Sequence, residues 1–430
     1  MKHILSFLSL VFALKKTPRT GWVLRGVKNP ETIAEHVFRT TMLSWVLGAG
    51  GNLRIQKVIS MSILHELCEV YAGDMTPYHE MLPSSRSERA TMLKRWIRLP
   101  RKEKEKAAVK KFIKEKRALE KLINPLREST KKEIMALWLE YEKGLSPEGR
   151  FVKQVDKIEA FFQAIEYFGT GLDTPVFGWW EEIEELVTNP VLAQFVKALE
   201  HHFYHGQKTE YDGIIQFCFN LGVLKRIPRP GWVVRKVKNP DSIANHITMH
   251  VLMLWIFAKE TAMPLNVEKL FKIGFMNGIA AGYVAATQKN TSSYDLLFKK
   301  AKNENQRQKL LKKWVRYSVR QKQEIFLRTY KEEKIALRSL VKTLDPRMQS
   351  EMMGLWEESK KNHTKEANFM KQVYVLETLF QALLYWSKDY KFPIEAWWEW
   401  AFERVDSDFS IAFMDELKRH FYSPKLKKSS

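Results

Sequence analysis

The chain carries the segment RTGWVLRGVKNP at residues 19–30 and a close copy of it, RPGWVVRKVKNP, at residues 229–240. Agreement this dense over a dozen positions indicates an internal duplication. Shorter matching segments follow in the same order: KQV at 153–155 and 371–373, WW at 179–180 and 397–398, and HFY at 202–204 and 420–422. We therefore predict two tandem domains, residues 1–207 and 208–430.

Both copies show the periodicity of amphipathic helices. Apolar side chains recur at spacings of three and four residues, as in Phe38, Met42 and Trp45. Acidic residues, Glu31 and Asp241, follow the Asn-Pro pairs that end the two matched segments, and we expect them in the first turns of helices. Glycine and proline are few, with 19 and 16 residues. The sequence predicts an all-α fold of two helical bundles.

Composition points to a soluble intracellular protein. Hydrophobic residues make up 45% of the 430 residues and charged residues 28%, so the chain can bury a core. Only two cysteines are present, Cys68 and Cys218, which favours a reducing compartment over a disulfide framework. The apolar start at residues 1–14 resembles a signal sequence, but its pattern recurs before residue 225, so we expect a domain helix. No apolar run is long enough to span a membrane, and we expect no membrane partner.

Positive charge is the unusual global feature. The chain has 71 Lys and Arg against 49 Asp and Glu, for a formal net charge of +22. Such a field attracts phosphates and nucleic acids. Lysine-rich stretches occupy residues 98–117 and 299–338, and basic side chains interleaved with aromatic ones can grip a phosphate backbone. The candidates for nucleic-acid contact are Lys110, Lys111, Lys312, Lys313 and Arg316, although such runs are more often solvated helix faces.

Two histidines and several carboxylates in the first copy form a candidate metal site. His36 lies early in one predicted helix, and His65 and Glu66 form an adjacent pair in another. We expect Glu69 on the same face of that second helix as His65, with residues 73 and 74 closing it. Asp156 stands alone among apolar residues of a later helix, where an unpaired buried carboxylate is costly. A single buried histidine is usually a core residue, but nitrogen and oxygen donors from separate helices suit a divalent cation.

The order of these motifs resembles the HD-domain 5′-deoxynucleotidase family of the YfbR type. The resemblance covers essentially the whole first copy, from Phe7 to His202. It implies a compact helical domain, usually a homodimer, that binds one divalent metal ion and releases phosphate from nucleoside 5′-monophosphates, especially deoxy ones. By this resemblance the metal ligands are His36, His65, Glu66 and Asp156.

The same resemblance implies roles for the neighbouring side chains. Glu69 would orient or deprotonate the attacking water, and Asp74 would lie near the sugar hydroxyl. Arg19 and Trp22 would contact phosphate and sugar, and Arg25 is a weaker candidate for phosphate binding. The family is named after a His-Asp pair, whereas this chain has Glu66 in the second position. The extra methylene puts metal binding in question, because ligand distances are held to about ±0.2 Å.

The second copy has lost most of these residues. His246 corresponds to His36, but Asn277 and Gly278 replace the His-Glu pair and Tyr374 replaces Asp156. One histidine cannot hold a catalytic cation, so we expect chemistry in the first copy alone. Arg229, Trp232 and Arg235 are retained, either as packing residues or as a residual anion pocket.

Two functions remain open at this stage. One is a metal-dependent hydrolase acting on a nucleoside monophosphate. The other is a catalytically decayed scaffold or RNA-binding subunit of a ribonucleoprotein assembly. Because relatives of this type pair as homodimers, we also predict that the fused second copy replaces the partner subunit in an intramolecular pseudo-dimer.

Overall fold

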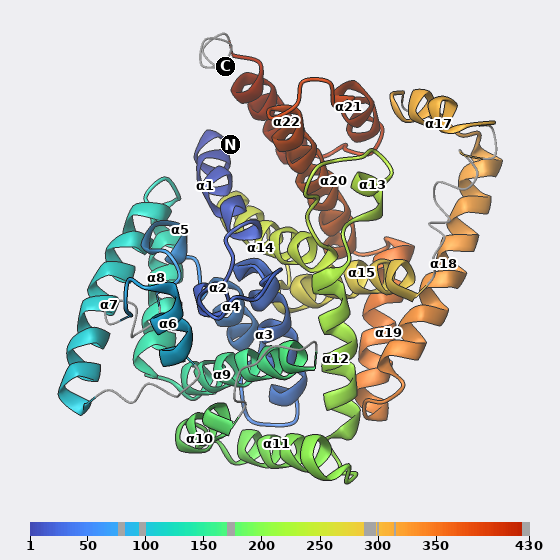
Figure 1. Cartoon of the computed structure of the whole chain (residues 1–430). Coiled ribbons are helices and arrows are strands. Elements are labelled where there is room, and N and C mark those ends of the chain that lie inside the picture. The colour runs from blue at the N-terminus through green and yellow to red at the C-terminus, as the bar shows by residue number, and fades with distance from the viewer. Residues whose placement is uncertain are drawn as a thin grey trace. The chain divides into compact units, whose positions relative to one another are not determined.

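The computed structural model describes residues 1–75, 82–93, 100–169, 177–287, 298, 301–313 and 315–423. Throughout these ranges the regular structure is helical, with two isolated β-bridges and no strand (Figure 1). The predicted all-α fold is confirmed. Within the lysine-rich stretches 98–117 and 299–338, residues 98–99, 299–300 and 314 lie outside the described ranges.

Contacts divide the chain into two compact units. The N-terminal unit is Phe7–Phe219, and the C-terminal unit combines Met1–Ser6 with Asn220–Ser430. The division therefore falls inside a helix, after the repeat boundary predicted at residue 207, and the first six residues cluster with the other half of the chain. The pseudo-dimer stays a prediction. None of the described helices is long and apolar enough to cross a membrane.

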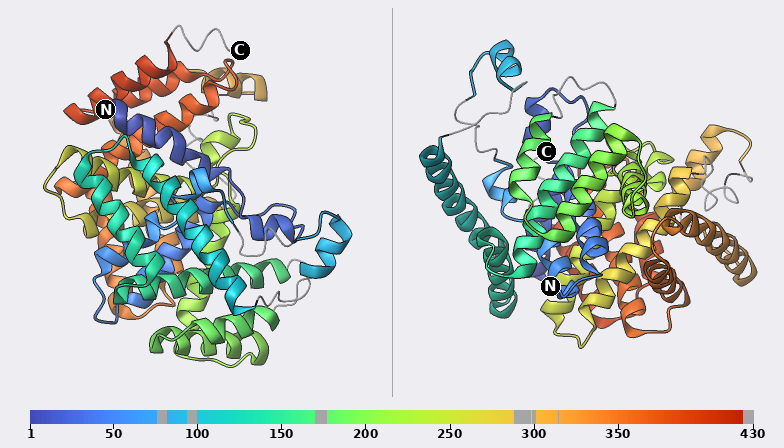
Figure 2. Two further views of the ribbon diagram at one scale, coloured as in Figure 1. Left: turned by 90° about the vertical axis from the view of Figure 1, so that its left-hand side faces the viewer. Right: turned by 90° about the horizontal axis from the view of Figure 1, so that it is seen from below.

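The α-helices of the first repeat lie in the N-terminal unit, except that the first residues of α1 and the last residues of α12 belong to the C-terminal unit. These are α1 (Lys2–Val11), α2 (Thr20–Leu24), α3 (Ile33–Gly48), α4 (Ile55–Leu64), α5 (Glu69–Ala72), α6 (Arg86–Leu93), α7 (Arg101–Ile123), α8 (Glu128–Lys143), α9 (Pro147–Phe168), α10 (Phe177–Leu186), α11 (Pro190–Glu200) and the start of α12 (Asp212–Arg226). At its centre α3, α4 and α9 pack against one another (Figures 1 and 2).

The C-terminal unit repeats this order in its described residues, and its helices α14 and α15 are longer than the matching α3 and α4. After α12 come α13 (Pro230–Val233), α14 (Ile243–Thr261), α15 (Val267–Thr287), α17 (Glu304–Leu311), α18 (Val319–Val341), α19 (Pro346–Lys361), α20 (Lys365–Trp386), α21 (Ile394–Phe402) and α22 (Asp408–Phe421). Here α14, α15 and α20 take the central places.

The central helix α3 begins at a capping box. Thr32 accepts the backbone N–H of Glu35, and the Glu35 carboxylate accepts the N–H of Thr32, so two unpaired donors of the first turn are satisfied. The helix thus starts after Glu31, which was predicted to lie in its first turn. Every residue of α3 is buried, and this fixes the position of His36.

The helix that carries the His-Glu pair differs between the repeats. In the first repeat α4 ends at Leu64, and the next residues form tight turns, with the N–H of Glu69 donating to the carbonyl of Glu66, before α5 begins. The prediction that His65 and Glu69 share one helical face is therefore wrong. In the second repeat α15 runs without a break, and a Cβ at Gly278 would lie 2.6 Å from Ile247.

Candidate metal centre

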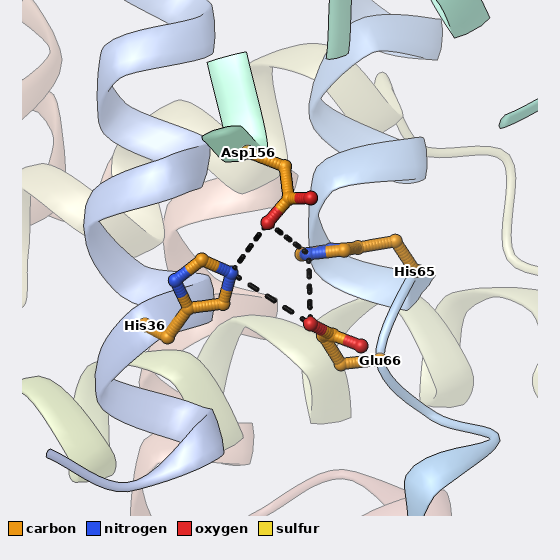
Figure 3. Close-up of side chains that lie close together, drawn as sticks. All are labelled: His36, His65, Glu66 and Asp156. Atoms are coloured by element: carbon orange, nitrogen blue, oxygen red, sulfur yellow. Dashed lines mark hydrogen bonds and ion pairs between the residues drawn. The ribbon is translucent and has the colours of Figure 1, made fainter. Parts of the chain in front are cut away.

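Four predicted ligands meet in the core of the N-terminal unit. His36 projects from α3, His65 and Glu66 from the turns after α4, and Asp156 from α9 (Figure 3). One ligand atom from each lies within 4.8 Å of the others. His36 Nε2 is 3.0 Å from Asp156 Oδ1, and the two histidine Nε2 atoms lie 3.7 and 3.6 Å from Glu66 Oε1. The longer Glu66 side chain therefore still reaches the centre of the cluster.

Hydrogen bonds fix both imidazole rings with Nε2 toward this centre. The Nδ1–H of His65 donates to the carbonyl oxygen of Ser62 at 2.8 Å, and the Nδ1–H of His36 donates to Glu159. In the neutral form of each ring, Nε2 then carries no proton and can bind a metal ion. His65 Nε2 is buried and has no hydrogen-bond partner among the described residues. A divalent cation fits these donors, because it would satisfy this nitrogen and two carboxylates at once.

The carboxylates of the cluster are ionised. Burial opposes the charge on Glu66, but His65 and Arg19 lower its pKa to about 2. Burial likewise opposes the charge on Asp156, and the ammonium of Lys157 together with His36 holds the pKa of Asp156 well below its usual range. Burial lowers the pKa of His65, which keeps that imidazole neutral. Burial opposes the charge on His36, but Glu159 and Asp156 raise its pKa to about 9, so this ring releases a proton when it binds a metal ion. The other three donors are already in the forms in which they bind metals.

Two side chains contact Oδ2 of Asp156, the carboxylate oxygen that does not face His36. The Tyr141 hydroxyl donates to Asp156 Oδ2 at 3.2 Å, and Lys157 Nζ lies 3.1 Å from the same atom. Asp156 Oδ1 is the atom that faces His36. One carboxylate oxygen is thus anchored and the other faces the cluster.

Arg19, Glu69 and Asp74 lie beside the cluster. The Arg19 guanidinium donates to Glu66 Oε1 at 2.5 Å, and Asp74 Oδ2 accepts the backbone N–H of Thr20 at 2.6 Å. This hydrogen bond connects the first residue of α2 to the segment that follows α5. Burial and the carboxylates Glu66 and Asp74 raise the pKa of Glu69, so this side chain keeps its proton more readily than an ordinary glutamate.

Trp22 and Arg25 lie in a separate aromatic layer. Trp22 is buried, donates from Nε1 to Glu31 Oε1 at 2.9 Å, and stacks on Trp179 with ring centroids 5.4 Å apart. The Arg25 guanidinium lies over the same Trp179 ring at 5.3 Å. Both residues pack the loop against the unit, so the roles in substrate binding implied for them stay predictions.

Sequence reasoning missed a buried charge network behind His36. Glu159 accepts from His36 Nδ1 and, at 2.8 Å, from Arg39 Nε, and all three side chains are fully buried. Arg39 also donates to Glu166 at 2.7 Å. The signal was present, since Arg39 follows His36 and Glu159 follows Asp156 by one helical turn, which places each pair on one face.

The basic candidates for nucleic-acid contact are divided between the two units, with Lys110 and Lys111 on α7 and Lys312, Lys313 and Arg316 in the C-terminal unit. Lys110, Lys312, Lys313 and Arg316 are exposed. Lys111 is half-buried, and its ammonium lies 3.4 Å from Glu115 in the next turn of α7. The described contacts give these residues no shared site.

The described residues of the second repeat hold no comparable cluster. His246 Nδ1 bonds to Glu377 at 2.6 Å, as His36 does to Glu159, but the Tyr374 ring stands beside it in the place of Asp156, with centroids 5.2 Å apart. Among the described residues of the C-terminal unit, no three side chains of His, Cys, Asp or Glu approach closely enough to share a metal ion.

Comparison with known proteins agrees with this geometry. The sequence model of the HD domain family matches residues 11–178 and 327–415, which is more than half of the chain. The chain belongs to the HD domain family. The first matched stretch contains all four clustered side chains, and the second lies within the C-terminal unit.

Some of the proteins that match this chain in sequence are named 5′-deoxynucleotidases. The bovine protein 5′-deoxynucleotidase HDDC2 is 32% identical over 166 residues, a match covering 39% of this chain and 68% of that protein. The fission yeast 5′-deoxynucleotidase hdd1 is 31% identical over 180 residues, covering 41% and 79%. A conserved hypothetical protein from Pyrococcus furiosus aligns in structure with a TM-score of 0.34 and 24% identity, over 45% of this chain and 98% of that one.

Proposed function

We propose that the chain is a metal-dependent phosphohydrolase that releases phosphate from nucleoside 5′-monophosphates, deoxy forms above all, using the N-terminal repeat alone. The observation that carries the proposal is the four-donor cluster, with its buried and unpartnered His65 Nε2. The relatives named 5′-deoxynucleotidases support the substrate class.

The metal ion would be held by His36, His65, Glu66 and Asp156. When bound, a divalent cation neutralises charge on phosphoryl oxygens and lowers the pKa of water. The side chains behind the ligands hold them in place before any ion arrives: Glu159 orients His36, and Tyr141 anchors Asp156. Such contacts strengthen metal binding, because the ligands are already oriented before the ion binds.

The remaining polar side chains would handle the substrate and the proton. Glu69 would orient the attacking water through the carboxylate oxygen Oε2, which has no partner among the described residues. To take the water's proton as well, Glu69 would first have to ionise against its raised pKa, which the positive charge of a bound cation would favour. The Arg19 guanidinium, beside Glu66, would bind the phosphate oxygens, for which its planar set of donors is suited. Asp74 would hold the loop of Arg19 through the N–H of Thr20 and approach the sugar hydroxyl.

The test combines metal content with phosphate release. Purified protein is analysed for divalent metals and assayed on a panel of ribo- and deoxynucleoside 5′-monophosphates, before and after chelation. We expect bound metal, release that is lost on chelation and restored by a divalent ion, and loss of both in Asp156→Ala. Asp156→Asn keeps the volume and removes the charge, so it separates a ligand role from a packing role. Thermal unfolding of both variants checks that they fold.

The proposal fails if folded wild-type protein holds no metal ion and releases no phosphate from any nucleotide of the panel. That result would leave the alternative of a non-catalytic scaffold or RNA-binding subunit. Exposure of Lys312, Lys313 and Arg316 permits nucleic-acid contact but gives it no specific geometry.

A further inference from the structure

The C-terminal unit contains a cavity where the first repeat has its metal cluster. Its volume is about 860 Å³, and its walls include His246 and the residues that replace the lost ligands, Asn277, Gly278 and Tyr374. This size is within the range of pockets that enclose small organic ligands. The decay of the metal site has therefore left a space and has not filled the core.

Charge in the lining is one-sided. Seven of the lining residues are lysines or arginines, and a single carboxylate, Glu333, faces them. Arg229 and Arg235 come from the loop at α13, and Lys360, Lys371 and Arg404 come from α19, α20 and the end of α21. Several of these cations have carboxylate partners: Lys360 lies 2.6 Å from Glu333, Arg229 lies 3.4 Å from Glu377, and Glu403 pairs with both Arg404 and Lys322. The cations still outnumber these carboxylates. The excess of positive charge calls for an anionic ligand.

Some of the donors in this lining have no acceptor. The indole N–H groups of Trp232 and Trp397 are buried, and neither has a hydrogen-bond partner among the described residues. In the first repeat the matching Trp22 donates to Glu31, but the second repeat has the shorter Asp241 at that position. Buried donors without partners cost about 1–3 kcal/mol each, and a small shift of the two indole rings toward the cavity would let the acceptor oxygens of a ligand satisfy them.

Aromatic rings complete the lining. Tyr317, Tyr330, Tyr374 and Trp400 line the cavity beside the two indoles. Flat rings of this kind stack on nucleobases with little dependence on the base. The lining thus offers cations for phosphate, aromatic faces for a base, and neither of the carboxylates that the first repeat offers to a metal ion.

We propose that this cavity binds a nucleoside phosphate without a metal ion and without hydrolysing it. The inference goes beyond the proposed function and does not rest on it, since the site shares none of its residues with the N-terminal cluster. The volume of the cavity, which suits one small ligand, and its buried lining residues His246, Met370 and Trp232 favour a mononucleotide over a polynucleotide strand.

The test is equilibrium dialysis of the full chain in excess chelator, with labelled dAMP, dATP and inorganic phosphate as probes. The background variant Asp156→Ala disables the N-terminal cluster. We expect one equivalent of nucleotide per chain, with inorganic phosphate bound at least about tenfold more weakly because it has no ring to stack.

Ala281 gives a matched pair of variants. It lines the cavity from an exposed position on α15, at the place of Glu69, so a longer side chain there removes no contact. Ala281→Glu adds a negative charge near the phosphate and is expected to raise the Kd about tenfold or more, since like charges a few ångströms apart repel strongly. Ala281→Gln adds the same bulk without charge and is expected to change the Kd by less than about threefold. Lys313→Glu, on an exposed lining residue, is expected to act as Ala281→Glu does.

Three results would overturn the proposal. The first is no saturable binding of either nucleotide in chelator. The second is binding that Ala281→Glu and Lys313→Glu leave unchanged, which would place the ligand elsewhere. The third is inorganic phosphate binding as tightly as the nucleotides, which would leave an anion site without a nucleoside. Phosphate release by the wild-type enzyme is measured separately, so failure here and failure of the proposed hydrolase are told apart.

Discussion

Replacing Glu159 by glutamine tests whether the buried network behind His36 serves metal binding. The Glu159 carboxylate accepts from His36 Nδ1 and from Arg39 Nε, and all three side chains are fully buried. Glutamine keeps the volume but offers one neutral acceptor and an NH₂ group. The amide can then no longer hold both donors, and the preference of His36 for the ring form with Nε2 free is weakened.

The expected magnitude follows from these contacts. Hydrogen bonds to charged groups contribute about 1.5–3 kcal/mol each, and Arg39 keeps its bond to Glu166, so we expect unfolding to become easier by about 2–3 kcal/mol. Loss of a partner behind a metal ligand typically weakens metal affinity about 10–100-fold, or about 1.4–2.7 kcal/mol. Calorimetric titration with a divalent metal ion measures the affinity, and urea unfolding of the metal-free protein measures the stability.

The second repeat supplies the control. Glu377 holds His246 at 2.6 Å and Arg229 at 3.4 Å in a place without metal ligands. Glu377→Gln is expected to lower the free energy of unfolding in a similar way while leaving metal affinity within about twofold. If Glu159→Gln binds metal as tightly as wild type while its stability falls, the network is structural only, and the reasoning about ring orientation is refuted.

Two further predictions concern the C-terminal unit. Gly278→Ala should destabilise by about 1–3 kcal/mol in urea, because its Cβ would approach Ile247 to 2.6 Å; Gly354→Ala, with open space around it in α19, should not destabilise. His250 is buried and bonds to the Met370 carbonyl, and burial together with His246 lowers its pKa to about 3. Its folded pKa is below the unfolded value of about 6.5, so stability present above pH 6.5 is lost on acidification, about 2 kcal/mol between pH 7 and 5. His250→Gln should lose clearly less over that interval in urea unfolding, and an equal loss would contradict the assigned cause.

The sequence was sufficient for the all-α fold, because helical periodicity is a local pattern. The resemblance to the HD-domain family identified the four side chains that the structure brings together. The sequence did not reveal the break after Leu64. No glycine or proline interrupts residues 62–70, and the matching stretch of the second repeat is a continuous helix. Tertiary packing determines whether this stretch forms a continuous helix or a helix interrupted by turns, and the periodicity of apolar residues does not reveal that packing. Glu159 was missed for a related reason: its role depends on the buried Arg39 opposite, on a helix far away in the sequence.

The unbroken course of α15 bears on whether the second repeat could regain its metal ion. Restoring the lost pair at Asn277 and Gly278 would place a side chain where Ile247 already lies, on a helix that lacks the turns which aim His65 and Glu66 inward. A reversion at Gly278 would be destabilising before it was useful. To regain the metal ion, the C-terminal unit would therefore need a changed course of α15 as well as new ligands.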